Sequence, residues 1–176
     1  MATWEEFARA EPGMAAHGER LLLLGPAEPG GLAGGLAYLA TVRRDGGPRI
    51  HPISPVLHQG RLYAFVLKVS PKKRDLLGNG RYALHSWPTP LSERFTVEEF
   101  FVAGRAALVT DPAIRQAVAD GCGDPVEAGE VFELALERAL HREPRNQDGR
   151  PVYHVWQDGG PRADDGARNG GAGPPP

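Results

Sequence analysis

The sequence predicts a mainly β fold in which a small antiparallel barrel carries flanking helices. Three observations lead to this fold class. Apolar runs of strand length fill the middle of the chain, tight turns rich in Gly, Asp and Pro separate them, and helical patterns lie mostly at the periphery. With 176 residues, the chain is long enough to bury the hydrophobic core of one compact domain.

Residues 1–35 are expected to form a helical segment and a linker ahead of the barrel. Thr3 is a candidate N-cap, because it closely precedes two glutamates that would occupy the first helical turn. Pro12 should divide residues 2–24 into two short helices, since proline disrupts a helix interior. Residues 25–35, GPAEPGGLAGG, form a flexible connector.

Strand-like runs make up most of residues 36–157, the predicted barrel domain. In the third run, Tyr63 and Phe65 share one face and Leu62 lies on the other, so both faces are apolar and expected to be covered. Gly104 should let the long fifth strand bend. The six predicted strands are residues 36–43, 49–57, 61–69, 81–87, 97–110 and 151–157.

Helices are predicted between and after these strands. One covers residues 70–78, and a second begins after Asp111, which is a candidate N-cap followed by proline. A third is expected over residues 130–140, where Val and Leu side chains are spaced mainly for burial on one side. Residues 158–176 contain almost no apolar residues and are predicted to form a disordered tail.

The segment Ser70–Leu76, SPKKRDL, carries a candidate anion site. Ser70 is a natural N-cap, and a proline and three consecutive cations follow it in the first helical turn. Each cation there costs roughly 0.3–1 kcal/mol against the helix dipole, so the arrangement favours a bound phosphate near Ser70, Lys72 and Lys73. The alternative is an ordinary exposed helix with solvated lysines.

A second candidate site is the proline-rich strand Pro48–Pro55, PRIHPISP. Proline donates no backbone hydrogen bond, so this segment cannot be a fully paired central strand. A flat ring that lies along such an edge and bonds to its main chain would explain the sequence. The alternative is an irregular edge strand that its prolines protect from aggregation.

Four segments, in this order, resemble a known superfamily: ATVRRDGGPRIHPI, GRLYAFV, SPKKRDLLGNGRYALHS and EEFFVAGRAALVTDP. They look like the pyridoxamine 5′-phosphate oxidase-like, FMN-binding split-barrel proteins. The resemblance covers residues 36–112 well and residues 113–157 more loosely. It implies a six-stranded antiparallel split β-barrel with flanking helices, and a homodimer with two cofactor sites in grooves between the subunits.

The resemblance also implies which residues contact the cofactor. The second strand would supply His51, Pro52, Ile53 and Ser54, the third strand Phe65 and Val66, and the phosphate cradle Ser70, Lys72 and Lys73, with Arg74 as a further candidate. Glu99 and Trp156 would come from the partner subunit.

The implied function is that of an oxidoreductase that binds FMN, or alternatively the deazaflavin coenzyme F-420, and transfers a hydride to or from a small substrate. No catalytic side chain is identified. The alternatives are a non-catalytic flavin-binding or storage protein and a haem-binding relative. No metal site is predicted, because His51, His58 and His85 lie on separate elements without an acidic companion at ligand spacing.

Composition excludes several other classes. The formal net charge of -2 gives no electrostatic case for nucleic acid or a membrane surface as the main partner. Cys122 is the only cysteine, which excludes an internal disulfide and fits a reducing compartment. The N-terminus lacks the apolar core of a signal peptide, and the run Leu21–Leu24 is far too short to cross a bilayer. We therefore expect a soluble, cytoplasmic protein.

Overall fold

The computed structural model describes residues 1–23, 35–86, 98–143 and 152–160. The predicted connector up to residue 34 and the predicted tail from residue 161 lie outside these ranges. None of the described helices is long and apolar enough to cross a membrane.

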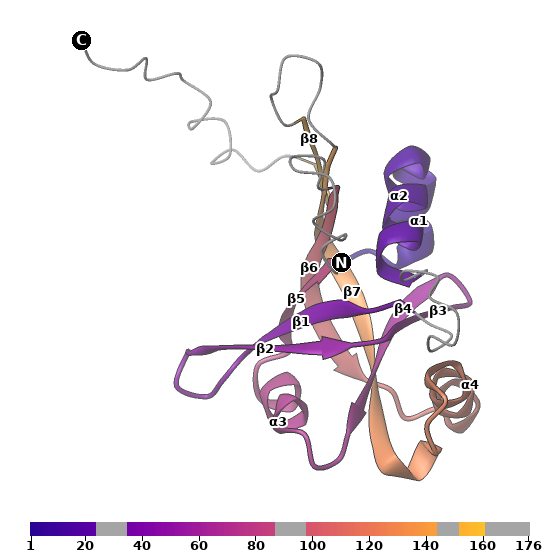
Figure 1. Cartoon of the computed structure of the whole chain (residues 1–176), viewed down its shortest axis with the longest axis vertical. Helices are drawn as coiled ribbons and strands as arrows, with labels where there is room; N and C mark the ends of the chain where they lie inside the picture. The colour runs from indigo at the N-terminus through magenta and orange to yellow at the C-terminus, as the bar shows by residue number, and fades with distance from the viewer. Residues whose placement is uncertain (24–34, 87–97, 144–151, 161–176) are drawn as a thin grey trace, which may run out of the picture.

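The described residues form one curled antiparallel sheet with helices around it (Figure 1). The helices are α1 (Trp4–Ala10), α2 (Pro12–Leu23), α3 (Pro71–Gly78) and α4 (Pro112–Cys122), with a 3-10 turn η1 (Val126–Ala128). The strands are β1 (Ala37–Val42), β2 (Pro48–Ile53), β3 (Pro55–His58), β4 (Arg61–Leu67), β5 (Arg81–Ser86), β6 (Glu99–Leu108), β7 (Gly129–Arg142) and β8 (Tyr153–Gln157). The predicted fold class, mainly β with flanking helices, is confirmed.

The strand order explains how the sheet curls. It runs β2-β1-β5-β6-β7-β4-β3, and β8 pairs with β7 outside this path. The two end strands, β2 and β3, are joined in the chain by the single residue Ser54. A sheet whose first and last strands meet in this way must bend back on itself, and Figure 1 shows β1 and β2 crossing the direction of β6 and β7.

The sheet has eight strands, two more than the sequence predicts. The predicted strand 49–57 divides at Ser54 into β2 and β3, which pair with different neighbours. As expected from its prolines, this segment supplies edge strands and no central strand. The predicted helix over residues 130–140 is wrong, because these residues belong to β7.

β7 forms despite its good helix formers because it has partners along its whole length. It pairs with β4, β6 and β8. Phe132, Leu134 and Leu136 point into the core while the residues between them are only half-buried. This period of two is the strand pattern, and strand preference depends on such packing more than on intrinsic propensity.

Gly104 marks an irregularity in the β6–β7 ladder, as predicted. The register shifts between Ala103 and Gly104, and Glu137 of β7 is left without a partner in the ladder. A Cβ atom at Gly104 would lie 2.0 Å from the carbonyl oxygen of Ala135. Only glycine allows the two backbones to approach so closely.

The N-terminal helices share the hydrophobic core of the sheet. Trp4, Phe7 and Leu22 are almost completely buried in the same cluster as Leu39 and Phe100. A smaller cluster lies under α4 and contains Tyr63, Phe65, Val118, Ala119 and Val131.

Replacing Thr3 by alanine is expected to lower the free energy of unfolding by about 1 kcal/mol. Thr3 and Glu6 form a complete capping box at the start of α1, as predicted for the cap, and the substitution removes the threonine hydroxyl. Thermal unfolding should show a decrease of roughly 2–4 °C in Tm. Thr3→Ser keeps the hydroxyl and should keep the Tm; an equal decrease in both variants would contradict the capping role.

Candidate functional site

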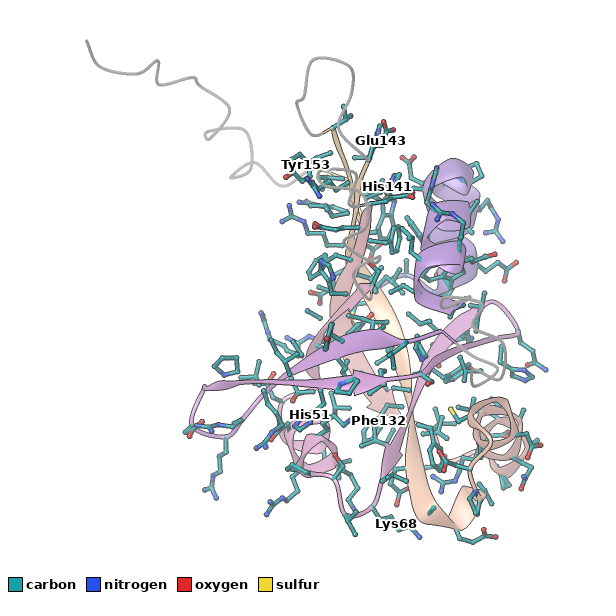
Figure 2. All side chains as sticks on the ribbon, viewed as in Figure 1. His51, Lys68, Phe132, His141, Glu143 and Tyr153 are labelled. Carbon is teal, nitrogen blue, oxygen red and sulfur yellow. The ribbon has the colours of Figure 1, made fainter. Side chains whose placement is uncertain are left out.

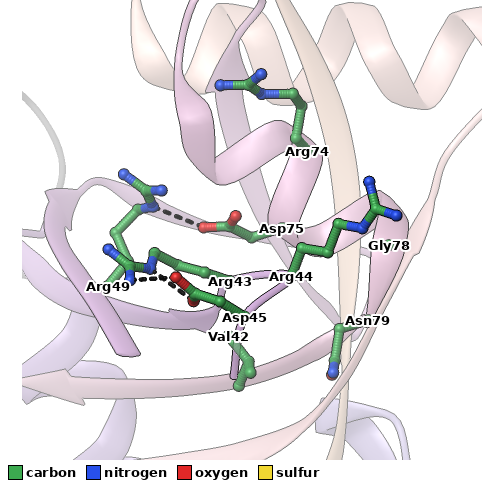
Figure 3. Close-up of a pocket in the computed structure, with 9 residues that line it drawn as sticks. All are labelled: Val42, Arg43, Arg44, Asp45, Arg49, Arg74, Asp75, Gly78 and Asn79. Carbon is green, nitrogen blue, oxygen red and sulfur yellow. Dashed lines mark hydrogen bonds and ion pairs between the residues drawn. The ribbon is translucent and has the colours of Figure 1, made fainter. Parts of the chain in front are cut away.

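A cleft of about 940 Å³ lies between α3 and the β1–β2 hairpin (Figure 3). The hairpin turns through residues 43–47, and α3 begins directly after the turn that follows β4. Four arginines and two aspartates line the cleft, so it carries a surplus of positive charge. The lining residues are Val42, Arg43, Arg44, Asp45, Arg49, Arg74, Asp75, Gly78 and Asn79.

Asp75 ties α3 to the hairpin at the base of this cleft. Its side chain is buried, and its Oδ2 accepts a hydrogen bond from Thr41 Oγ1 at 2.9 Å and another from Arg49 Nε at 2.7 Å. Arg49 is 27% exposed, so the ion pair is partly shielded from water. This pair fixes the guanidinium of Arg49 at the cleft wall.

The other arginines of the cleft are held less firmly. Arg43 pairs with Asp45 on the exposed hairpin, with Nε–Oδ1 and Nη2–Oδ2 distances of 3.0 and 2.5 Å. Arg44 and Arg74 form no ion pair with any residue that the structure describes. These two guanidinium groups are available for an anion, to which arginine offers a fork of donors.

Lys72 lies at the N-terminus of α3 and is only 9% exposed. Its Nζ donates a long hydrogen bond of 3.4 Å to the carbonyl oxygen of Pro52 on β2, and no carboxylate among the described residues pairs with it. Burial lowers the pKa of Lys72. The ammonium group has three donors, so this contact leaves most of its capacity for a ligand.

Ser70 occupies the N-cap position of α3, as predicted, but its hydroxyl makes no capping hydrogen bond. The hydroxyl therefore remains usable by a bound anion. Lys73 is half-buried beside it. Of the predicted phosphate cradle, the structure thus places Ser70, Lys72 and Lys73 on one helical turn, and the side chain of Lys72 reaches the predicted ring-binding strand.

The residues predicted on the second strand differ in exposure. His51 and Ser54 are half-buried and Pro52 is exposed, whereas Ile53 packs in the main core. The carbonyl oxygen of Ser54 lies 3.7 Å from the Sγ of Cys122. The outer edge of β2 pairs with no other described strand, so the main chain of alternate residues, including the carbonyl group of Pro52, is open on that side.

Two predicted contacts on the third strand are core residues in the single chain. Val66 is in the main cluster, and Phe65 packs against Gly129 of β7, where a Cβ atom would lie 2.5 Å from the ring. Their side chains support the site from within. Any contact that they make with a ligand would therefore involve mainly the backbone or the partly accessible ring of Phe65.

The structure does not bring Glu99 and Trp156 to this region within one chain. Glu99 pairs with Arg142 at 3.2 Å, and the ring of Trp156 packs on Phe7 with the centroids 5.0 Å apart. Figure 1 shows β8, which carries Trp156, at the opposite end of the molecule from α3. Only a second subunit would bring these residues to the site.

Sequence reasoning missed the contribution of Arg44, Arg49 and Asp75. The motif RRDGGPR, with arginines on both sides of a tight turn, was the available signal for the first two. Asp75 gives no such signal, because its partners Thr41 and Arg49 are far away in the sequence.

No family model matches the sequence, and a search of curated proteins finds no match. Solved structures do match. The haem-binding protein of Mycobacterium smegmatis has a TM-score of 0.54 and 18% identity, covering 69% of this chain and 53% of that one. HutZ, the haem storage protein of Vibrio cholerae, has a TM-score of 0.53 and 14% identity, covering 72% of this chain and 88% of that one. A NimC/NimA family protein of Clostridium acetobutylicum has a TM-score of 0.51 and 13% identity, covering 69% of this chain and 84% of that one.

These likenesses define the class of fold. The chain shares its fold with these proteins, a curled antiparallel sheet with flanking helices, which agrees with the split barrel that the sequence predicts. It spans about half the length of the Mycobacterium smegmatis protein. At these identities the likeness is one of fold, and the function must be argued from the site.

Proposed function

We propose that this chain binds a phosphate-bearing flavin, FMN or the deazaflavin coenzyme F-420, and acts as an oxidoreductase on a small substrate. The observation that supports this best is the buried ammonium group of Lys72, which lies beside the open edge of β2 without a carboxylate partner among the described residues. Burial disfavours the charged form of Lys72, and a bound anion would offset that cost.

The donor set fits a phosphate group. Ser70 contributes a hydroxyl that does not cap the helix, and Lys72 contributes its ammonium group and its backbone amide at the start of α3. Arg74 and Arg49 add positive charge in the cleft between α3 and the hairpin. A dianionic phosphate placed there would offset both the desolvation of Lys72 and the repulsion among these cations.

The flat ring of the cofactor would lie along β2. The main chain of β2 offers hydrogen-bonding groups at alternate residues, Pro52 among them, on an edge that no described strand covers. Proline at position 52 removes one amide donor but leaves its carbonyl, which already receives Lys72. These residues bind and orient the ring, and the bound flavin or deazaflavin supplies the hydride chemistry.

Of the described residues, neither Cys122 nor His85 is set up as a nucleophile. Burial raises the pKa of Cys122 to about 11, so its thiol stays protonated at neutral pH. His85 Nδ1 donates to the carbonyl oxygen of Ser86 at 2.8 Å. The single reduced thiol suits the cytoplasm, which we propose as the compartment.

The visible spectrum of the purified chain during titration with FMN and, separately, with coenzyme F-420 tests this function. Saturable binding of either compound, followed by turnover with an electron donor and an acceptor, would support an oxidoreductase. Binding without turnover would indicate the storage alternative. A Soret band without flavin binding would indicate a haem-binding protein, and binding of none of these would contradict the proposal.

We also propose that the functional unit is a homodimer. Leu67 at the end of β4 and Val69 just before α3 are both exposed, and Val69 is 91% exposed. Exposed apolar side chains that occur together normally mark an interface. Other large apolar side chains with high exposure are Ile50, Leu77 and Leu108.

Sedimentation at micromolar concentration is expected to give twice the mass of the chain. Replacing Leu67 and Val69 together by glutamate should shift the chain toward the monomer and weaken flavin binding, because the site would lose Glu99 and Trp156 of the second subunit. Replacing Ala113, an exposed residue at the start of α4, by glutamate serves as the control. A monomeric unsubstituted chain would refute the dimer.

A further inference from the structure

We propose that His17, Glu98 and His141 form a binding site for one divalent transition-metal ion of the zinc type, separate from the cleft beside α3. The three residues come from α2, from the residue before β6 and from β7. Their ligand atoms all lie within 4.8 Å of one another.

The geometry centres on one carboxylate oxygen. Glu98 Oε1 lies 2.8 Å from His17 Nδ1 and 3.0 Å from His141 Nε2. Ligands of a tetrahedral zinc ion lie about 3.3 Å apart, given bond lengths of about 2.0–2.1 Å. Only a small outward movement of the three groups would admit the ion, and the exposed His17 side chain can supply it.

The side chains are already oriented by their surroundings. His141 is 2% exposed, and its ring stacks on that of His17 with centroids 4.2 Å apart. Arg20 Nη2 donates to Glu98 Oε2 at 2.5 Å, which leaves Oε1 directed at the two imidazoles. A hydrogen bond of this kind to the second oxygen of a ligating carboxylate fixes its direction, as in established metal centres.

The donor set indicates the class of ion. Two imidazole nitrogens and one carboxylate oxygen suit Zn²⁺ and its neighbours Co²⁺ and Ni²⁺ better than Mg²⁺ or Ca²⁺, which prefer oxygen. Three protein ligands leave a fourth position for water.

A neighbouring set of residues competes for the same ion. His141, Glu143 and His154 also bring their ligand atoms within 4.8 Å, and the rings of His141 and His154 stack at 5.8 Å (Figure 2 labels His141 and Glu143). Both Glu143 and His154 are about half exposed, whereas Glu98 is 15% exposed. We assign the ion to the Glu98 set, because a more buried carboxylate is better desolvated and held.

Such an ion would join the N-terminal helices to the sheet. His17 lies on α2, whereas Glu98 directly precedes β6 and His141 lies on β7, and these two strands are paired. At His17 and Arg20 this connection is made by side-chain hydrogen bonds, ion pairs and the stacking of the His17 and His141 rings. Metal binding would therefore also stabilise the packing of α2, because an ion that binds only the folded chain shifts unfolding to higher temperature.

The test is a Zn²⁺ titration of the untagged, chelator-treated full chain against a chromophoric competitor. One Zn²⁺ should bind per chain and raise Tm, and His17→Ala and Glu98→Gln should each weaken binding at least about tenfold. Co²⁺ should give the d–d absorption of a protein site, and this absorption should disappear in His17→Ala. His17 is exposed, so its substitution leaves the fold intact.

Two control variants separate this assignment from the alternatives. His58→Ala removes an imidazole outside the cluster and should leave binding unchanged, as should His154→Ala. Loss of binding in His154→Ala with retention in His17→Ala would place the ion in the other set and overturn the assignment. Binding that survives both His17→Ala and Glu98→Gln, or no stoichiometric binding to the unsubstituted chain, would also overturn it.

Discussion

Replacing Lys72 by alanine is expected to weaken binding of FMN, or of coenzyme F-420, at least tenfold. The ammonium group is buried at the start of α3 and has no carboxylate partner among the described residues, so a bound phosphate would be its main counter-charge. Loss of a charged hydrogen-bond partner costs about 1.5–3 kcal/mol, and about 1.4 kcal/mol corresponds to tenfold in the dissociation constant. Fluorescence or absorbance titration measures the change directly.

Lys68→Ala is the matched control for this result. This substitution also removes one lysine charge from the segment around the start of α3. Lys68, however, is exposed, directly follows β4 and precedes the first turn of α3. Screening by solvent should limit its effect on affinity to about twofold. If both variants lose affinity equally, the overall positive charge of this region, and not a specific contact of Lys72, explains binding. If Lys72→Ala binds the cofactor normally, the phosphate group does not lie at the first turn of α3.

Local signals in the sequence predicted helix ends correctly. Thr3 caps α1, and Asp111 accepts hydrogen bonds from two backbone amides at the start of α4. These contacts depend on residues within one turn, so they can be read without the fold. The strand β7 was missed for the opposite reason, since its partners on β4 and β6 lie far away in the sequence.

The candidate site divides in the same way. The turn at Ser70 and Lys72 was visible in the sequence because serine, proline and cations follow one another. The cleft wall was not, because Asp75 meets Thr41 and Arg49 only after α3 packs on the hairpin. The His17–Glu98–His141 cluster was missed for the same reason, because His17 and His141 are separated from Glu98 by 81 and 43 positions in the sequence.

Replacing Asp75 by alanine is expected to lower the free energy of unfolding by about 2–4 kcal/mol. The carboxylate is buried and accepts hydrogen bonds from both Thr41 and Arg49, so its removal leaves a partly buried guanidinium and a hydroxyl without their acceptor. The expected loss of unfolding free energy is smaller than for a fully buried ion pair because the Arg49 side chain is 27% exposed. Thermal unfolding should show a decrease of roughly 4–16 °C in Tm.

Asp45→Ala is the control within the same cleft. Its pair with Arg43 is exposed, with side chains 62% and 45% accessible, so its loss should lower Tm far less than the loss of Asp75. A double-mutant cycle with Arg49→Met then separates the ion pair from the packing of α3, because a buried unpaired charge is relieved when both partners are removed. The double variant should therefore be more stable than Asp75→Ala alone. If it is less stable, the contact of Asp75 with Thr41 and the packing of the helix, and not the pairing with Arg49, hold α3 against the hairpin.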